Sequence, residues 1–327
     1  MFQGLLLLIV LIWPCDVFGQ ALPKARMAYT SINIQMTPIY MMKDLDLSRK
    51  HGLDTEVLMI PVSSRAIQAA LAGEIQFMTS GGVANINANM SGGDFVGITS
   101  TISAFVFKII GQPGIKDPSQ LKGKKVAISR LGGASDFSLR FGLDRWGLVP
   151  EKDLAIIQIG GEAEALLALQ NKAVDAATIS EPFTTIAQRE GFSVVSDLSR
   201  LNVPYTLHGI GTRKSIIRER RDMVVRFMRA YVEAIYLFKT KKDLALSTLK
   251  KYARMSDISL MNNTYEDYSQ RLIPAVPYPI ASGIQTIIDH LAKTRPEAKG
   301  LKPQDFIDAS ILKEIEDSGF VKKLYAN

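Results

Sequence analysis

From Arg26 to Gly211, short apolar runs alternate with longer segments in which apolar residues recur at helical spacing. The runs that predict strands cover residues 26–29, 56–60, 75–78, 95–99, 105–110, 126–128, 154–159, 174–179, 192–196 and 206–211. The segments that predict helices begin near Pro38, Ser63, Thr79, Ser135, Glu162 and Glu181. Strands and helices that alternate through short loops are typical of a mostly parallel sheet with helices on both faces. The pattern therefore predicts an α/β fold.

After Arg213 the pattern becomes helical. An apolar stripe at helical spacing comprises Val224, Phe227, Met228, Tyr231, Ala234, Ile235 and Phe238, and similar stripes follow at 284–291 and 311–315. Arg226, Arg229 and Glu233 lie off the first stripe. We interpret these stripes as core packing in a helical C-terminal tail rather than as a cofactor site.

The stretch 121–148 combines a strand, a loop with Gly132 and Gly133, and a long helix. The glycines permit positive φ and close backbone approach, and the first helical turn leaves N–H groups without intrahelical partners. These N–H groups would hold a small ligand, unless Ser135 or Asp136 caps the turn or the stretch is an ordinary βα connection. Neither nucleotide motif, G-x-G-x-x-G or G-x-x-x-x-G-K-[ST], is present.

Composition narrows the class of partner. The chain has 327 residues, 47% hydrophobic and 22% charged, which suits about two globular domains with full cores. The formal charge of +7 favours anionic over cationic solutes. The basic residues are scattered and their densest runs lack interleaved aromatic residues, so we expect no nucleic-acid partner.

The N-terminus predicts export. Residues 5–13 form an apolar block that is too short to span a bilayer, and the small residues Gly19 and Ala21 follow. We interpret residues 1–21 as a signal peptide, cleaved after Gly19 or Ala21, although no Lys or Arg precedes the block. Cys15 is the only cysteine, and Pro14 before it disfavours a lipid anchor. The mature chain would therefore contain no disulfide and no thiol nucleophile.

The sequence gives little support for catalysis. His51, His208 and His290 lie on elements that should be far apart, so we expect no metal site and no cofactor. Neither G-x-S-x-G nor H-E-x-x-H is present. Asp136 and Glu181 would make a carboxylate pair like that of glycosidases, but nothing else indicates such an enzyme. We predict a binding protein rather than an enzyme.

Several short motifs occur in a particular order, at residues 38–40, 50–54, 70–75, 121–128, 147–148, 168–169, 174–177 and 181–182. With this set the chain resembles the periplasmic solute-binding proteins of ABC importers, specifically the NMT1/THI5-like group with its sulfonate-, nitrate- and pyrimidine-binding receptors. The resemblance covers about residues 29–183, and the tail is similar only in character. The cysteine-rich motif of the pyrimidine synthases is absent, which argues against that enzymatic branch.

The resemblance implies the type II periplasmic-binding-protein fold, in which two α/β lobes are joined by two crossing strands. The resemblance implies crossings near 110–114 and 203–209, and this placement agrees with the direction change at Pro113 and with Pro204. Lobe one would then comprise 22–111 and 206–327, and lobe two 112–205. The partners implied are a small-molecule ligand and the permease subunits of an ABC transporter, with the receptor acting as a monomer.

The same resemblance places the ligand between the lobes, where five loops should converge. The candidate ligand-binding residues are Ser31, Asn33, Gln35, Thr37, Ser80, Gly81, Gly82, Arg130, Gly132, Gly133, Ser135, Asp136, Glu181 and His208. The serines and acids have alternative roles as helix caps or first-turn residues, and His208 as an ordinary hinge residue.

The ligand itself is predicted from charge. Helix N-termini at Gly82, Ser135 and Pro182, together with Arg130, favour a small organic anion such as a sulfonate, carboxylate or nitrate. Asp136 and Glu181 favour instead a heterocycle with N–H donors, such as an aminopyrimidine. A ligand-sensing domain for a membrane kinase would use the same fold and stays open as an alternative to transport.

Overall fold

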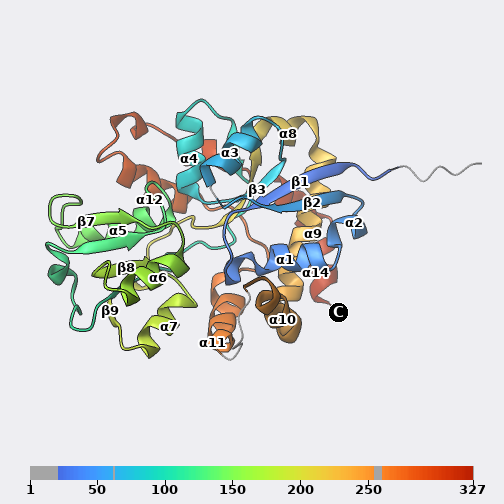
Figure 1. The fold of residues 1–327 in the computed structure, drawn as a ribbon. Helices are drawn as coiled ribbons and strands as arrows, with labels where there is room; N and C mark the ends of the chain where they lie inside the picture. Colours follow the sequence, from blue (N-terminus) through green and yellow to red (C-terminus); the bar gives the residue numbers. More distant parts are fainter. Residues whose placement is uncertain (1–20, 62, 254–259, 327) are drawn as a thin grey trace, which may run out of the picture.

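Two five-stranded sheets organise the computed structural model, which describes residues 21–61, 63–253 and 260–326 (Figure 1). The predicted signal peptide up to residue 20, with Cys15, lies outside the described residues. Within those ranges, no helix is long and apolar enough to cross a membrane.

The first sheet has the strand order β2-β1-β3-β10-β4. Its strands are β1 (Lys24–Tyr29), β2 (Asp54–Met59), β3 (Phe77–Ser80), β4 (Phe95–Gly97) and β10 (Gly209–Arg213). β1 pairs in parallel with β2 and β3, whereas β10 is antiparallel to β3 and β4.

The second sheet repeats this arrangement with the order β7-β6-β8-β5-β9. Its strands are β5 (Lys108–Gly111), β6 (Lys125–Ile128), β7 (Ala155–Gln158), β8 (Ala176–Ile179) and β9 (Ser193–Asp197). β6 is parallel to β7 and β8, and β5 is antiparallel to β8 and β9. In both sheets, therefore, one antiparallel strand interrupts an otherwise parallel set.

Alternation of side chains explains why each sheet is covered on both faces. In β6, Val126 and Ile128 contribute to the largest core cluster, while Ala127 between them packs in a second cluster. The helices that follow the strands supply the two layers. They are α1 (Thr37–Asp44), α2 (Leu47–Lys50), α3 (Ser63–Leu71) and α4 (Gly82–Met90) around the first sheet, and α5 (Ala134–Arg145), α6 (Glu162–Gln170) and α7 (Phe183–Arg189) around the second.

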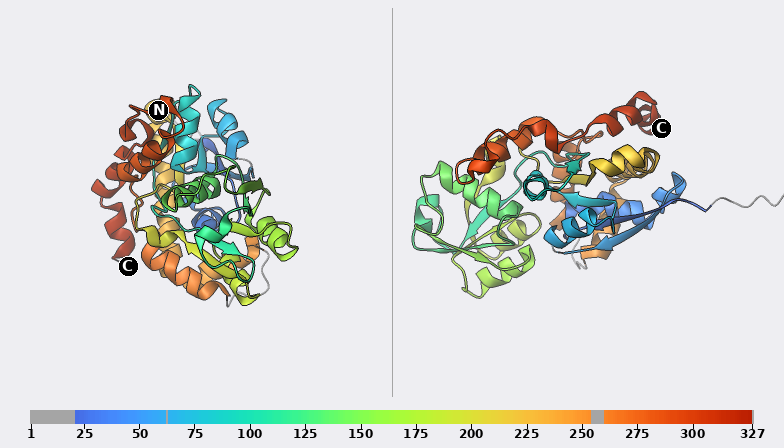
Figure 2. Two further views of the ribbon diagram at one scale, coloured as in Figure 1. Left: turned by 90° about the vertical axis from the view of Figure 1, so that its left-hand side faces the viewer. Right: turned by 90° about the horizontal axis from the view of Figure 1, so that it is seen from above.

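The helical tail follows β10. It contains α8 (Lys214–Glu219), α9 (Arg221–Thr240), α10 (Lys242–Ala253), α11 (Leu260–Asp267), the π-helical turn η4 (Tyr268–Leu272), α12 (Ala281–Leu291), α13 (Ser310–Asp317) and α14 (Phe320–Tyr325). The predicted apolar stripe is buried in α9, which packs against α1, α2 and α10. The right-hand view in Figure 2 shows the second sheet with its helices, in green, beside the first sheet, in blue.

Two expectations about strand positions were wrong. β5 pairs with β8 and β9 in the second sheet, so the chain changes sheet before Lys108 and not after Gly111. The return segment, by contrast, overlaps the crossing expected near 203–209, since β9 ends at Asp197 and β10 begins at Gly209. We call residues 98–107 and 198–208 the two crossing segments. Thr79 and Ser80, expected to open a helix, are the last residues of β3.

Candidate functional site

The strand directions place the carboxyl edges of the two sheets opposite each other. β4 runs in the same direction as β3, so it ends at the carboxyl edge of the first sheet. β5 is antiparallel to β8, so it begins at the carboxyl edge of the second sheet. β9 ends at that edge too, and β10 begins at the first. Both crossing segments thus join carboxyl edge to carboxyl edge. In α/β sheets, this is where ligands bind.

The two crossing segments are bonded to each other. The Ile102 amide donates to the His208 carbonyl at 2.9 Å, and the Tyr205 amide donates to the Ser103 carbonyl at 3.2 Å. The ring of Tyr205 stacks on that of Phe105 at 4.3 Å and on that of Phe137, from α5, at 5.2 Å. The segments therefore form one packed connection between the sheets.

At the edge of the first sheet, the loop after β1 is tied to the end of β3. The Thr30 amide donates to the Thr79 hydroxyl at 3.2 Å. Farther along the loop, the Asn33 side-chain amide donates to the Ser31 hydroxyl at 3.2 Å, and the Tyr40 hydroxyl donates to the Ser31 carbonyl. Ser31 is half-buried and has local partners.

Several predicted residues at this edge carry buried polar atoms that have no hydrogen-bond partner in the described part of the chain. They are Oδ1 of Asn33, Oγ1 of Thr37 and Oγ of Ser80. Gln35, on the turn η1 (Ile34–Met36), is half-buried. An unpaired buried polar atom is costly, so these atoms are candidates for contact with a bound solute or water.

Gly81 and Gly82 lie where neighbouring atoms come too close to the backbone to leave room for a side chain. A Cβ on Gly81 would collide with the Leu207 carbonyl, and one on Gly82 would meet the side chains of Ile284 and Ile287. The Gly82 amide donates to the Thr206 carbonyl at 2.9 Å. The start of α4 is thus packed between the second crossing segment and α12, and Gly81, its N-cap, offers no side-chain cap.

His208, in the second crossing segment, is buried and only 3% exposed. Its Nε2 lies 3.3 Å from the Met36 sulfur, and its Nδ1 has no partner among the described residues. Burial lowers the pKa of His208 to about 4, so the ring is neutral at pH 7. It adds no charge to the site.

In the second sheet, the loop between β6 and α5 is held by its own side chains. The Ser135 hydroxyl lies 2.7 Å from the Ser129 hydroxyl and accepts from the Ser129 amide at 3.0 Å. Asp136 accepts from the Gly132 amide at 2.7 Å and from Nε of Arg140 at 2.7 Å. The alternative that Ser135 or Asp136 caps α5 does not hold, since the N-cap is Gly133 and no side chain bonds there.

Arg130 reaches across to the other sheet. Its guanidinium donates to the carbonyl of Pro61, which follows β2, at 3.2 Å. Arg130 is half-buried, and no carboxylate pairs with it among the described residues. Its charge is therefore available at the edge where the two sheets face each other.

Glu181 is paired inside the protein. One oxygen accepts from Nζ of Lys108, at the start of β5, at 3.2 Å. The other accepts from the amide and hydroxyl of Thr185, at 3.1 and 2.8 Å, and so occupies the first turn of α7. The predicted anion site at Pro182 is consequently filled by this carboxylate.

Sequence reasoning missed Lys108 and Glu162, which are bonded to Glu181 and Ser180. Glu162 starts α6 after a strand and two glycines, a signal of the kind that identified the loop before α5. One of its oxygens accepts from the amide and hydroxyl of Ser180, at 2.6 and 2.7 Å. Burial raises the pKa of Glu162, and the nearby Glu181 adds to the increase.

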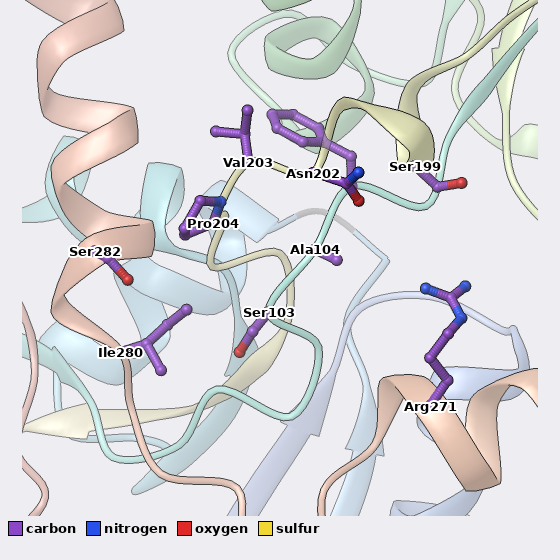
Figure 3. A pocket seen from close by; sticks show the side chains of 10 residues that line it. Ser103, Ala104, Ser199, Asn202, Val203, Pro204, Arg271, Ile280 and Ser282 are labelled. Atoms are coloured by element: carbon purple, nitrogen blue, oxygen red, sulfur yellow. The ribbon is translucent and has the colours of Figure 1, made fainter.

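A cavity of about 360 Å³ adjoins the crossing segments (Figure 3). It is lined by Ser103, Ala104, Phe105, Ser199, Asn202, Val203, Pro204, Arg271, Ile280 and Ser282. None of the predicted site residues lines it. Both crossing segments and the tail form its walls, so a movement of these parts against one another would change the shape of the cavity. Among the described residues, no group of His, Cys, Asp and Glu could hold a metal ion.

The family model described as NMT1/THI5 like matches residues 33–241. A Bacillus subtilis protein, provisionally named an aliphatic sulfonates-binding protein, is 24% identical over 330 residues and covers 95% of this chain and 96% of its own. The periplasmic aliphatic sulphonate binding protein SsuA from Escherichia coli has a TM-score of 0.72, with 20% identity, over 90% of this chain and 100% of its own. The periplasmic nitrate-binding protein NrtA from Synechocystis PCC 6803 has a TM-score of 0.76, with 14% identity, over 91% and 89%. The fold is therefore the predicted periplasmic-binding-protein fold, and these similarities are to binding proteins, not to enzymes.

Proposed function

Because the chain belongs to the NMT1/THI5-like family, we propose that it is the solute-binding receptor of an ABC importer and captures a small organic anion between its two sheets. The observation that carries this proposal is the pair of facing carboxyl edges, joined by two crossing segments. Closure of two lobes about such a connection would bury the solute.

The charge of the site supports an anion. α4 and α5 begin at this edge behind glycine N-caps, so no side chain caps their first turns. The N-terminus of a helix favours negative charge. Arg130 adds a positive charge.

The two acids that would oppose an anion are both paired. Asp136 is bonded to Arg140, and Glu181 to Lys108. Each pair removes most of the repulsion that an isolated carboxylate would exert. The names of the relatives, an aliphatic sulfonates-binding protein and a nitrate-binding protein, agree with an anionic solute.

We propose further that residues 1–21 direct export to the periplasm and that the mature protein acts as a monomer, delivering its solute to permease subunits. A relative from Brachyspira hyodysenteriae provisionally named an ABC transporter periplasmic binding protein, 25% identical over 66% of each chain, supports this location and partner. Lobe two would extend from β5 to β9, and lobe one would combine the first sheet with the tail.

Thermal unfolding with candidate solutes tests the ligand class. Mature protein would be melted with sulfonates, carboxylates, nitrate and pyrimidines, since a bound solute stabilises the folded state by mass action. We expect an increase in Tm with at least one organic anion. An increase with a pyrimidine and with none of the anions would contradict the proposed class.

Arg130→Ala tests the site. We expect the affinity for the stabilising anion, measured by calorimetry, to fall at least tenfold, because a charge-assisted hydrogen bond is lost. Arg189→Ala is the matched control, since Arg189 is exposed in the last turn of α7, away from the carboxyl edge. Equal affinities in the wild type and in Arg130→Ala would remove Arg130 from the site.

A further inference from the structure

Helix α12 is fixed to the first sheet. The side chain of Ile287 lies so close to Gly82, where α4 begins, that a Cβ there would be 2.5 Å from it. Just beyond α12, the Arg295 guanidinium donates to the side-chain carbonyl of Asn87, on α4, at 2.8 Å. The turn η6 (Pro303–Phe306) packs against both α12 and β4. α12 should therefore move together with the first sheet.

The same part of the tail also reaches α5, which covers the second sheet (Figure 1). The ring of His290 lies edge-on to that of Phe137, with 5.0 Å between the ring centres, and 5.5 Å from that of Phe141. One turn later, Nζ of Lys293 donates to the carboxylate of Asp144 at 2.5 Å. The three α5 residues are spaced i, i+4 and i+7, so they form one face of that helix. α12 thus bridges the two sheets through side chains.

This bridge lies away from the connection about which the lobes would rotate. α12 begins against the second crossing segment, since a Cβ on Gly283 would lie 2.6 Å from Oγ1 of Thr206. A helix rises about 1.5 Å per residue, so His290 lies about 10 Å farther along the axis. Displacement in a rotation grows with distance from the pivot, and so a rotation of lobe two would strain the contacts of His290 and Lys293. The ion pair is about half exposed, 55% for Lys293 and 46% for Asp144, and exposed pairs are weak enough to break and re-form.

We propose that His290 and Lys293 form a latch that favours the arrangement in which Arg130 bonds to Pro61 across the two sheets. The latch acts on α5, whose first turn the proposed function assigns to the anion, so its effect on binding rests on that function. The apparent affinity of a receptor is reduced by the fraction of molecules that is not competent to bind. A latch that raises the competent fraction therefore strengthens binding without contact with the solute.

Charge reversal tests the ion pair. Lys293→Glu and Asp144→Lys each bring like charges together, and the double variant restores an opposite pair. Calorimetry would use ethanesulfonate, propanoate and nitrate. For each probe that the wild type binds, we expect the single variants to bind at least about threefold more weakly and the double variant to match the wild type. Lys299→Glu, at an exposed position beyond α12 that forms no ion pair in the described part of the chain, is the matched control and should change nothing.

Distances between the lobes test the latch without a solute. Spin labels would be attached to cysteines at Gln68, exposed on α3, and Leu167, exposed on α6. We expect Lys293→Glu and His290→Ala to broaden the distance distribution of the unliganded protein. The charge-reversed double variant should restore the narrower distribution, and so should His290→Phe, which keeps an aromatic ring against Phe137.

These measurements separate the latch from the proposed function. Single variants that bind as tightly as the wild type, or a double variant that binds as weakly as the single ones, would overturn the latch and leave the anion receptor intact. Distributions that are the same in the wild type, Lys293→Glu and His290→Ala would overturn it too. If none of the probes binds the wild type, the proposed function fails for these anions, and the distances alone then support or overturn the latch.

Discussion

The polar residues of the site divide into those that hold the loops and those that remain free. Ser135, Asp136 and Glu181 were predicted as ligand contacts, and each is already bonded to a neighbouring residue. The sequence predicted the type of each residue and its position in a βα loop. It did not predict the hydrogen-bond partners of these residues, because the sequence does not distinguish a carboxylate that accepts from Gly132 from one that faces a solute.

Glu233, in the core, is a second residue whose partners could not be predicted from the sequence. It lies off the apolar stripe of α9 in the sequence pattern, yet it is only 6% exposed. The side chain is buried because the turn after α2 covers it, and Lys50 and His51 donate to its two oxygens at 2.5 and 2.7 Å. Burial alone would raise the pKa of Glu233, but these hydrogen bonds outweigh burial and lower it.

Glu233→Gln should therefore destabilise the protein at pH 7, by about 1–3 kcal/mol, because it weakens a buried charge-assisted contact. A carboxyl group with a lowered pKa in the folded state contributes stability above its unfolded pKa, and the contribution is lost as pH falls through the folded value. We expect urea unfolding to show a difference between wild type and variant that shrinks as the pH falls below about 4. Lys50→Ala, which removes an exposed partner, should cost less than about 1 kcal/mol. A difference that stays constant down to pH 3 would contradict this account.

At the scale of elements, the alternation of apolar runs predicted every strand of both sheets to within a few residues. Hydrophobic periodicity reports burial, which is local. It does not report pairing, and so β5 was placed with the wrong set of strands. Lys108–Gly111 joins the second sheet through hydrogen bonds to β8 and β9, which are more than 60 residues away in sequence. That information is absent from any short window of the chain.

The loop between β6 and α5 gives a test at this scale. Gly132 has φ of +71°, whereas Gly133 has φ of −90°, a value open to any residue. Gly132→Ala should lower the free energy of unfolding by roughly 1–2 kcal/mol through left-handed strain. Gly133→Ala should cost clearly less, since its φ suits any residue and its Cβ would meet only atoms of Arg130, the nearest being the carbonyl oxygen at 3.1 Å. Chemical denaturation of both variants measures the difference, and equal losses would show that φ does not govern this loop.

For the whole molecule, short motifs in the sequence were enough to predict the fold. They did not predict how the two lobes are placed against each other. Motions of one sheet against the other depend on contacts between segments that are distant in sequence. Such contacts include the bond of Arg130 to Pro61 and the ion pair of Lys293 with Asp144, at 2.5 Å. The aromatic stack of Phe105, Tyr205 and Phe137 lies at the connection itself. Closure about this connection is the remaining step in the proposed mechanism.

Spin labels can measure that closure, because the only cysteine of the chain lies in the predicted signal peptide. Cysteines would replace Gln68, exposed on α3 beside the first sheet, and Leu167, 55% exposed on α6 beside the second. We expect a stabilising anion to shift the distance distribution between these labels to a new, narrower maximum, since a bound solute would select the closed arrangement. Gln68 and Lys250, exposed on α10, form the control pair, because α10 packs against α1 and α9 on the side of the first sheet. Their distance should not change. A shift in the control pair would place the tail outside lobe one, and an unchanged distance between α3 and α6 at saturating solute would exclude closure of the two lobes.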